Sequence, residues 1–361
     1  MKFVPPKPHL DGVWRTPHRL ETRQGFELMD RNERTVDFPP QVMEDIRRLI
    51  DPFTLRAYPE PEALYGRLAA WLNVPREMLL ITMGADGGLR AVFDAFVAPG
   101  DEVVTVAPSY GMYPVLSAMA GATVRRVQFN ADLSLPLEQV LARINHRTKA
   151  VVLANPNQPI ERVYDEAEMV TLVEACAEHD ALLVMDEAYH HFCPLTAAPL
   201  LRDHGNLVVV RSFSKAFGIA GLRVGYVISR PENIAHLEKV RPVYETSSVA
   251  IPVCLYLLEH DELMRSYVAE VKEAMGRLTA TLRHLGFESS GRWGNSILVT
   301  LPSAVSGQDV GEALKKRGFL IRVETEPPLS NHLRVTVGSS AQAERFLAAF
   351  EGVVRDGRWS R

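Results

Sequence analysis

The sequence predicts an α/β fold in which a mostly parallel sheet lies between helices and a smaller α+β domain follows it. Strands buried on both faces are expected in four short, valine-rich segments: 101–106, 150–154, 181–186 and 206–212. Helical spacing in the stretches between them, such as 166–180, favours parallel strands with crossover helices. The apolar segment 224–229 follows 206–212 too closely for such a crossover, so we expect it to run antiparallel.

The other elements divide the chain into three parts. Residues 1–30 are rich in proline, histidine and arginine without clear periodicity, which favours an arm over a neighbouring surface or frayed chain. We therefore expect an arm or small-domain segment at 1–35, a large domain at 36–250 and a small domain at 251–361. Helical spacing occurs at 61–74, at 84–97 and through much of 250–285. Strand-like segments follow at 297–302, 319–324 and 332–338, before a final helix.

The composition is that of an ordinary enzyme. The chain has 361 residues, which favours two folding units, with 47% hydrophobic and 23% charged residues. Its net charge of −4 does not indicate nucleic-acid binding. The three cysteines are far apart and show neither metal-ligand spacing nor a disulfide framework, so we expect a cytoplasmic protein without a metal site. No signal peptide or uninterrupted apolar run of membrane-spanning length is present, so no membrane association is expected.

Two motifs carry candidate chemistry. In SFSKAFGIAGLRVGY (212–226), Lys215 follows two serines at the end of a predicted strand, and Arg223 comes eight residues later. An amine can form an imine with an aldehyde cofactor, while hydroxyls and a guanidinium suit a phosphate. In MDEAYHHF (185–192), Asp186 ends another predicted strand. A carboxylate buried there needs a partner, and a pyridinium N–H would serve. Tyr189, three residues later, could form a hydrogen bond with the cofactor's phenolic oxygen. Taken singly, Lys215 could be an incidental surface lysine and Asp186 a helix cap.

Together, S-x-S-K-x-x-x-x-x-G-x-R-x-G-Y and D-E-A-Y resemble the fold-type I aminotransferases, which bind pyridoxal 5′-phosphate (PLP), and most closely the histidinol-phosphate aminotransferase group. The resemblance runs from about residue 26 to the C-terminus, with the motifs in family order. It implies a seven-stranded, mostly parallel sheet, PLP as cofactor and a homodimer. The implied partners are an amino acid, of which glutamate is the natural choice, and a small, possibly phosphorylated, keto or aldehyde substrate.

The resemblance also implies roles for individual cofactor residues. Lys215 would form the imine and transfer the proton, and Asp186 would pair with the pyridine nitrogen. Tyr110, in PSYGMY, would stack on the ring, and Tyr58, in AYPEP, would reach the phosphate of the other subunit's cofactor. The phosphate cup would be made by Gly84, Ala85, Asp86, Ser212, Ser214 and Arg223.

Three arginines near the C-terminus are candidates for substrate binding. Arg334 resembles the residue that holds a substrate carboxylate or phosphate, and Arg322 and Arg345 stand where this group carries arginines. Arg322 and Arg334 lie in valine-rich strands, where an unpaired charge is costly, so we expect an anionic ligand for both. Arg345 lies on the terminal helix, where a solvated arginine is the common alternative. Asn32, in a motif near the family's substrate, is a fourth candidate.

Two family motifs are altered. The motif usually written N-P-N-N-P-T-G reads Asn-Pro-Asn-Gln-Pro-Ile-Glu at 155–161, and Asn157 and Gln158 are the cofactor-binding candidates within it. Gln158 replaces the asparagine that donates to the phenolic oxygen; its amide could still donate from a longer stem. The motif N-E-N-P reads Asn-Glu-Arg-Thr at 32–35. Such changes fit drift within a transaminase, or a specialised enzyme with an unusual substrate.

Three functions follow, in order of preference. The first is a PLP-dependent aminotransferase that exchanges an amino group by a ping-pong route. The second keeps the cofactor and changes the reaction, as in the threonine-phosphate decarboxylases, which share the architecture. The third is a catalytically silent PLP-binding module, against which the presence of Lys215, Asp186, Tyr189 and Arg223 counts.

Overall fold

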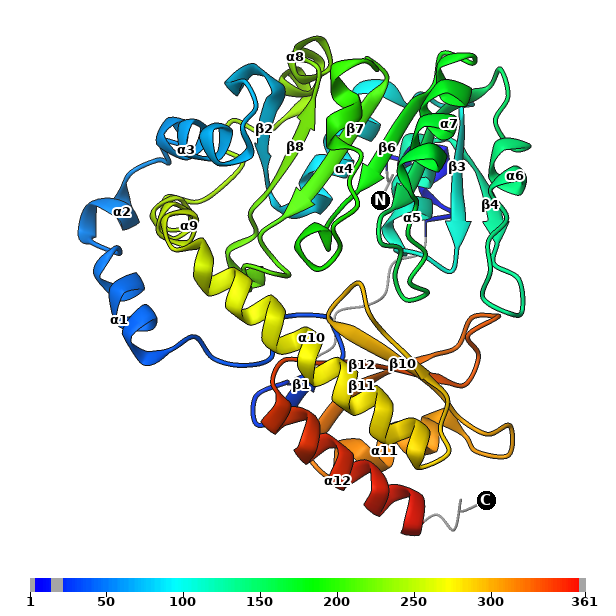
Figure 1. Ribbon diagram of the computed structural model, residues 1–361. Coiled ribbons are helices and arrows are strands. Elements are labelled where there is room, and N and C mark those ends of the chain that lie inside the picture. The colour runs from blue at the N-terminus through cyan, green and yellow to red at the C-terminus, as the bar shows by residue number, and fades with distance from the viewer. Residues whose placement is uncertain (1–3, 14–21, 357–361) are drawn as a thin grey trace.

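The computed structural model describes residues 4–13 and 22–356, and its larger sheet has seven strands in the order β2-β8-β7-β6-β5-β3-β4 (Figure 1). The strands are β2 (Leu79–Thr82), β3 (Glu102–Ala107), β4 (Thr123–Gln128), β5 (Thr148–Ala154), β6 (Leu182–Asp186), β7 (Leu207–Ser212) and β8 (Gly225–Ser229). Strands β3 to β7 run parallel to one another, while β8 is antiparallel to both β7 and β2. The predicted mostly parallel sheet and the antiparallel direction of 224–229 are confirmed.

Side chains that alternate along the strands build a core on each face of this sheet. On β7, Val208 and Val210 pack with residues of α4 (Gly84–Phe96), α5 (Met112–Ala120) and α8 (Pro231–Val240). The intervening Leu207 and Val209 join the larger core on the other face, which includes α3 (Glu62–Leu72), α7 (Glu166–Ala177) and α9 (Ala250–Glu259). Such strands read as continuous apolar runs because both faces are covered.

The smaller sheet has five strands in the order β1-β11-β12-β10-β9. They are β1 (Glu27–Met29), β9 (Ser289–Ser290), β10 (Ser296–Thr300), β11 (Phe319–Glu324) and β12 (His332–Thr336). Helices α10 (Asp261–His284), α11 (Gly307–Lys316) and α12 (Ser340–Asp356) pack with it (Figure 1). Residues of α10 belong to the same core as residues of the large sheet, so this long helix ties the two sheets together.

Shorter helices complete the described chain. The α-helices are α1 (Pro40–Arg48), α2 (Pro52–Arg56) and α6 (Leu137–Leu141). The 3₁₀ helices are η1 (Pro8–Leu10), η2 (Arg76–Met78), η3 (His190–Phe192), η4 (Ala198–Arg202) and η5 (Ala220–Leu222). Among the described residues, no helix has the length and apolar character needed to cross a bilayer.

The structure contains strands that the sequence did not reveal. Strand β1 is three residues long and forms by parallel pairing with β11, so it has no period of its own to read. Strand β4 lies at the sheet edge and contains Arg125 and Arg126, which break the apolar pattern. Residues 8–10, within the predicted arm, pack against α5, whereas 1–3 and 14–21 lie outside the described residues. The boundaries at 35 and 250 stay predictions.

Candidate active site

The predicted cofactor residues gather at one edge of the seven-stranded sheet. Asp186 is the last residue of β6, Ser212 is the last of β7, and Lys215 follows in the next turn. Gln158 lies in the turn after β5, and Tyr110 lies in the turn between β3 and α5. Because the carboxyl ends of parallel strands meet at one edge, residues far apart in the chain come together there, where ligands of open α/β sheets bind.

Two adjacent buried carboxylates at this edge have different partners. Glu187 forms an ion pair with the guanidinium of the buried Arg211, with an Nη2–Oε2 distance of 2.9 Å. Asp186 has no ion pair among the described residues; it accepts hydrogen bonds from the Tyr113 hydroxyl at 2.8 Å and the Ala188 amide at 3.1 Å. Burial raises the pKa of Asp186 to about 6. A buried carboxylate without a cation favours a bound cationic or N–H donor.

The start of α4 and Arg223 form a cradle for an anion. Gly84 has φ +69°, a backbone conformation in which a side chain would be strained, and a Cβ there would lie 2.7 Å from Nη2 of Arg223, so the guanidinium would have to move. Arg223 has φ 55°, an uncommon value for a residue with a side chain and one often found at functional sites. Among the described residues no side chain caps the amino end of α4, which leaves its backbone amides free for an anion.

Side chains around this cradle are linked to each other. Arg223 contacts the Ser214 hydroxyl at 3.4 Å and the Asp86 carboxylate at 3.2 Å. Asp86 also accepts a hydrogen bond from the Tyr110 hydroxyl at 2.7 Å, and the Tyr110 ring is 42% exposed. Ser212 is buried and accepts a hydrogen bond from the Ser214 amide. The six residues predicted to form the phosphate cup thus lie together, and the partly exposed side chain of Tyr110 lies beside them.

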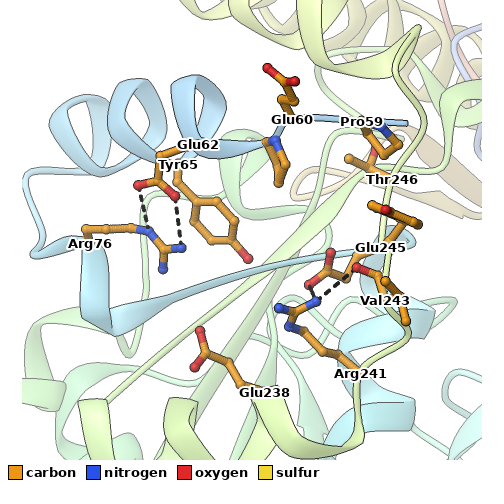
Figure 2. A pocket seen from close by; sticks show the side chains of 12 residues that line it. Pro59, Glu60, Glu62, Tyr65, Arg76, Glu238, Arg241, Val243, Glu245 and Thr246 are labelled. Carbon is orange, nitrogen blue, oxygen red and sulfur yellow. Dashed lines mark hydrogen bonds and ion pairs between the residues drawn. The ribbon is translucent and has the colours of Figure 1, made fainter. Parts of the chain in front are cut away.

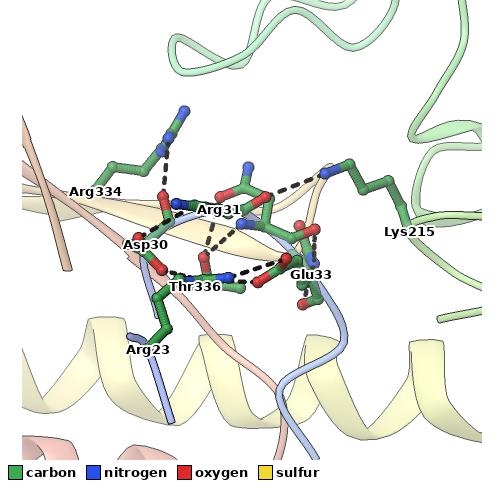
Figure 3. A network of polar contacts seen from close by, with 9 residues as sticks. Arg23, Asp30, Arg31, Glu33, Lys215, Arg334 and Thr336 are labelled. Carbon is green, nitrogen blue, oxygen red and sulfur yellow. Dashed lines mark hydrogen bonds and ion pairs between the residues drawn. The ribbon is translucent and has the colours of Figure 1, made fainter. Parts of the chain in front are cut away.

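Lys215 reaches from the large sheet to the segment that crosses the small one (Figure 3). Its Nζ donates to the carbonyl of Arg31 at 3.2 Å and lies 5.6 Å from the centre of the Tyr189 ring. The next residue, Asn32, is buried and donates to the Tyr189 hydroxyl at 2.9 Å. The predicted base, the predicted tyrosine and Asn32 therefore meet at one point between the two sheets.

The two candidate cofactor residues of the altered turn 155–161 have different hydrogen-bond partners. Asn157 is buried, and its side-chain amide donates to the carbonyls of Pro108 and Ile160 at 3.1 and 3.0 Å, so both N–H groups serve the turn itself. The amide of Gln158 donates to the Glu161 carboxylate at 3.2 Å. Cofactor contact by Asn157 and Gln158 stays a prediction.

The three candidate arginines are spread over the small domain. Arg334 and Arg322 face each other across β12 and β11, and both lie within 4 Å of Glu324. Arg334 is largely buried, and its Nε is a buried atom without a hydrogen bond among the described residues. Arg322 is 52% exposed, so the cost of a buried charge applies to Arg334 alone. Arg345, on α12, pairs with Glu27 of β1 at 2.6 Å. Their contacts with substrate stay predictions.

Tyr58 lies after α2, and its side chain is 75% exposed. Its ring stacks on Tyr244 with centres 4.5 Å apart. Next to this pair is a pocket lined by charged and polar side chains, including Arg76, Arg241 and Glu245 (Figure 2). The pocket is separate from Lys215 and Asp186, so we do not assign the chemistry to it.

Sequence reasoning missed four residues that hold the site residues. Tyr113 bonds Asp186, Ser109 bonds Asn157, and Ser296 and Thr336 bond Asn32. Tyr113 stands three residues after Tyr110 in PSYGMY and could have been noticed as a second aromatic residue on that turn. The serines and Thr336 carry no local signal, because their role depends on contacts across the fold.

Comparisons with known proteins agree with this geometry. The family model of aminotransferase class I and II matches residues 28–350. Histidinol-phosphate aminotransferase of Caldanaerobacter subterraneus subsp. tengcongensis is 31% identical over 333 residues, 90% of this chain and 92% of the relative. Histidinol-phosphate aminotransferase 3 of Mesorhizobium japonicum is 30% identical over 329 residues, 91% of this chain and 88% of the relative.

Solved structures share the fold. The crystal structure of histidinol-phosphate aminotransferase from Sinorhizobium meliloti in complex with pyridoxal-5′-phosphate has a TM-score of 0.89 and 24% identity, covering 98% of this chain and 99% of that one. The aspartate aminotransferase from Thermus thermophilus with maleate has a TM-score of 0.75 and 25% identity, covering 91% and 92%. The fold-type I resemblance is confirmed, and the chain belongs to the aminotransferase class I and II family.

Proposed function

We propose that this protein is a PLP-dependent aminotransferase that moves an amino group between an amino acid such as glutamate and a small substrate that carries an anionic group. The observation that carries the proposal is Asp186: a buried carboxylate that has no cationic partner among the described residues, at the same sheet edge as a lysine and an anion cradle. PLP has an N–H-bearing ring, an aldehyde and a phosphate, and each matches one of these features.

The residues of the chain divide the work. Arg223 and the start of α4 would hold the phosphate, and Asp186 would keep the ring nitrogen protonated. The exposed face of Tyr110 would cover the ring. When bound, PLP supplies an aldehyde for the amino group and an electron-accepting ring. The amine of Lys215 is the proton carrier, since it lies between the two sheets within reach of Tyr189 and the Arg31 carbonyl.

The substrate proposal rests on the relatives and on Arg334. Several relatives are named histidinol-phosphate aminotransferases, so a substrate with both an amine and a phosphate is the first choice. Arg334 is the arginine best placed to hold its anionic group, because it is largely buried and its Nε, 3.6 Å from the Glu324 carboxylate, makes no hydrogen bond among the described residues. A guanidinium binds a carboxylate or phosphate with two parallel hydrogen bonds.

A homodimer in the cytoplasm is part of the same proposal. Exposed apolar side chains surround Tyr58: Phe53, Leu55, Val243 and Tyr244. Such a surface favours burial against a second copy, which would bring Tyr58 to the partner's phosphate site. Size-exclusion chromatography with light scattering tests the dimer. Tyr58→Phe should leave the dimer intact and weaken PLP binding if the hydroxyl reaches the phosphate.

The first experiment is an absorbance spectrum of the PLP-loaded protein before and after L-glutamate, then histidinol phosphate. Conversion of the bound PLP to pyridoxamine phosphate, verified by chromatography, supports amino transfer. Release of CO₂ with PLP unchanged would favour the decarboxylase alternative. A protein that takes up no PLP, and whose Lys215 is not modified after borohydride treatment, would contradict the proposal.

A further inference from the structure

Glu161, which stands where the related motif has glycine, joins the altered turn to the small sheet. Its carboxylate accepts the backbone amide of Arg292 at 2.6 Å and that of Trp293 at 3.0 Å. The Gln158 side chain donates to the same carboxylate at 3.2 Å. The turn 292–294 approaches so closely that a Cβ on Gly294 would lie 2.5 Å from Nε2 of Gln158. The Glu161 side chain thus joins the turn that follows β5 to the turn that precedes β10.

A carboxylate can only accept hydrogen bonds, and this restriction propagates through the neighbouring side chains. Gln158 must turn its NH₂ toward Glu161, which leaves its Oε1 to accept from the Ser296 hydroxyl at 3.4 Å. With its proton committed, Ser296 accepts from the Asn32 amide at 3.2 Å. The same NH₂ of Asn32 donates to the Tyr189 hydroxyl at 2.9 Å.

Thr336 supports the same orientation of Asn32 from a second side. Thr336 is fully buried, its hydroxyl donates to Oδ1 of Asn32 at 3.1 Å, and its oxygen accepts the Asn32 backbone amide at 2.9 Å. With the proton of Ser296 directed to Gln158, the NH₂ of Asn32 faces Ser296 and Tyr189. Tyr189 therefore acts as an acceptor toward Asn32, and none of the described residues accepts the proton of its hydroxyl.

We propose that Glu161 is a positioning residue whose carboxylate sets the direction of this hydrogen-bond chain and thereby keeps the Tyr189 proton free to be donated to the bound cofactor. The inference rests on the proposed function, because PLP supplies the phenolic oxygen that would accept this proton. It assigns to Gln158 a role as a link in the chain, in place of direct donation to the cofactor.

Burial of the Glu161 carboxylate costs free energy unless its oxygens accept hydrogen bonds. Burial raises the pKa of Glu161, while the amides of Trp293 and Arg292 act in the opposite direction. A half-buried carboxylate that replaces a glycine of the related motif and accepts hydrogen bonds from Gln158 and from the amides of Arg292 and Trp293 is difficult to explain as a solvated side chain.

The first test uses the PLP-free protein and measures hydrogen exchange of the Arg292 and Trp293 amides. Glu161→Ala removes both acceptors, and Glu161→Gln keeps only one oxygen for them. We expect exchange of these amides to rise about fivefold or more in Glu161→Ala, since one hydrogen bond typically contributes a factor of about five. Glu288→Gln, at an exposed carboxylate before β9, is the control. Unchanged exchange in Glu161→Ala would overturn the proposal.

The second test separates positioning from simple bracing. A hydrogen bond to the phenolic oxygen stabilises its ionised form, so weakening it should raise the pH midpoint of the absorbance change of the PLP-loaded protein. We expect Glu161→Gln, whose NH₂ can reverse the chain, to raise this midpoint by about 0.7 pH unit, the equivalent of a fivefold effect. Glu161→Asp, which still only accepts, should stay closer to the wild type.

The outcomes distinguish this inference from the proposed function. A wild-type protein that binds no PLP contradicts the proposed function and the inference with it. A wild-type protein that binds PLP, with the same midpoint in Glu161→Gln, overturns the inference alone and leaves Glu161 as a structural brace.

Discussion

The large sheet and the small sheet both contribute charged residues to the candidate site, and they hold them in different ways. At the carboxyl edge of the large sheet, Asp186 is buried with no cation beside it in the described part of the chain, and Arg223 is held in a left-handed backbone conformation beside Gly84. On the small sheet, Arg322 is half exposed, and Arg345 is paired with Glu27. Fold and packing determine the first set closely and the second set loosely.

This difference follows from what each sheet must recognise. A cofactor is the same in every member of a family, so the residues that hold it occur in motifs at fixed strand ends. A substrate differs between members, and the residues that hold it lie on strands whose local sequence admits many alternatives. Of the three candidate arginines, Arg334 is the one that lies on the small sheet and is also largely buried, beside Glu324.

The largest effect is expected at Lys215. Lys215→Ala removes the amine, and amino transfer should fall about 10³-fold or more, because a positioned general base contributes about 10²- to 10⁴-fold. Borohydride should no longer link PLP to the chain, which mass spectrometry of the digested protein checks. Lys239→Ala, at an exposed lysine of α8, is the control. Retained turnover in Lys215→Ala would place the proton carrier elsewhere.

Asp186 should show the next effect. In Asp186→Asn the ring nitrogen loses its charged partner, and kcat should fall about 10- to 100-fold, as expected for a hydrogen bond to a charged group. Asp203→Asn, at an exposed site after η4, should leave kcat unchanged. An unchanged kcat in Asp186→Asn would mean that the ring nitrogen is held by another group.

Asp186 also gives a pH dependence without the cofactor. Burial raises its pKa to about 6, above an unfolded-state value near 4, so the folded protein retains a proton in this interval that the unfolded chain has lost. The free energy of unfolding of the PLP-free wild type should therefore fall by about 2 kcal/mol relative to Asp186→Asn as the pH rises from 4 to 7. Urea titrations at several pH values measure this; parallel curves for the two proteins would contradict the assignment.

The sequence was sufficient for most of the large sheet and its edge. Strands such as 182–186 and 207–212 are apolar throughout because they are buried on both faces, and this can be read directly. Strand β1 could not be predicted, because its three residues become a strand only through pairing with β11. Strand β4 was missed because Arg125 and Arg126 interrupt its apolar pattern at the sheet edge.

Prediction of the site was limited in the same way. Lys215, Asp186 and the cradle residues have motifs, and the structure brings them together. The partners that orient them, such as Tyr113 for Asp186 and Thr336 for Asn32, depend on side chains that meet across the fold. The contact of Glu161 with the turn 292–294 is of this kind: the sequence shows a lost glycine, and only the fold shows what the carboxylate binds.

The smallest effects should separate the three arginines. Arg334→Gln should raise KM for an anionic substrate about tenfold or more, since a hydrogen bond between charged groups is lost. The effect of Arg322→Gln should be smaller, because an exposed guanidinium is already solvated. Arg345→Gln should change KM less than about twofold, because its exposed pair with Glu27 contributes little. Steady-state kinetics on all three variants tests this order. A tenfold rise in KM for Arg345→Gln would instead assign that arginine to the substrate.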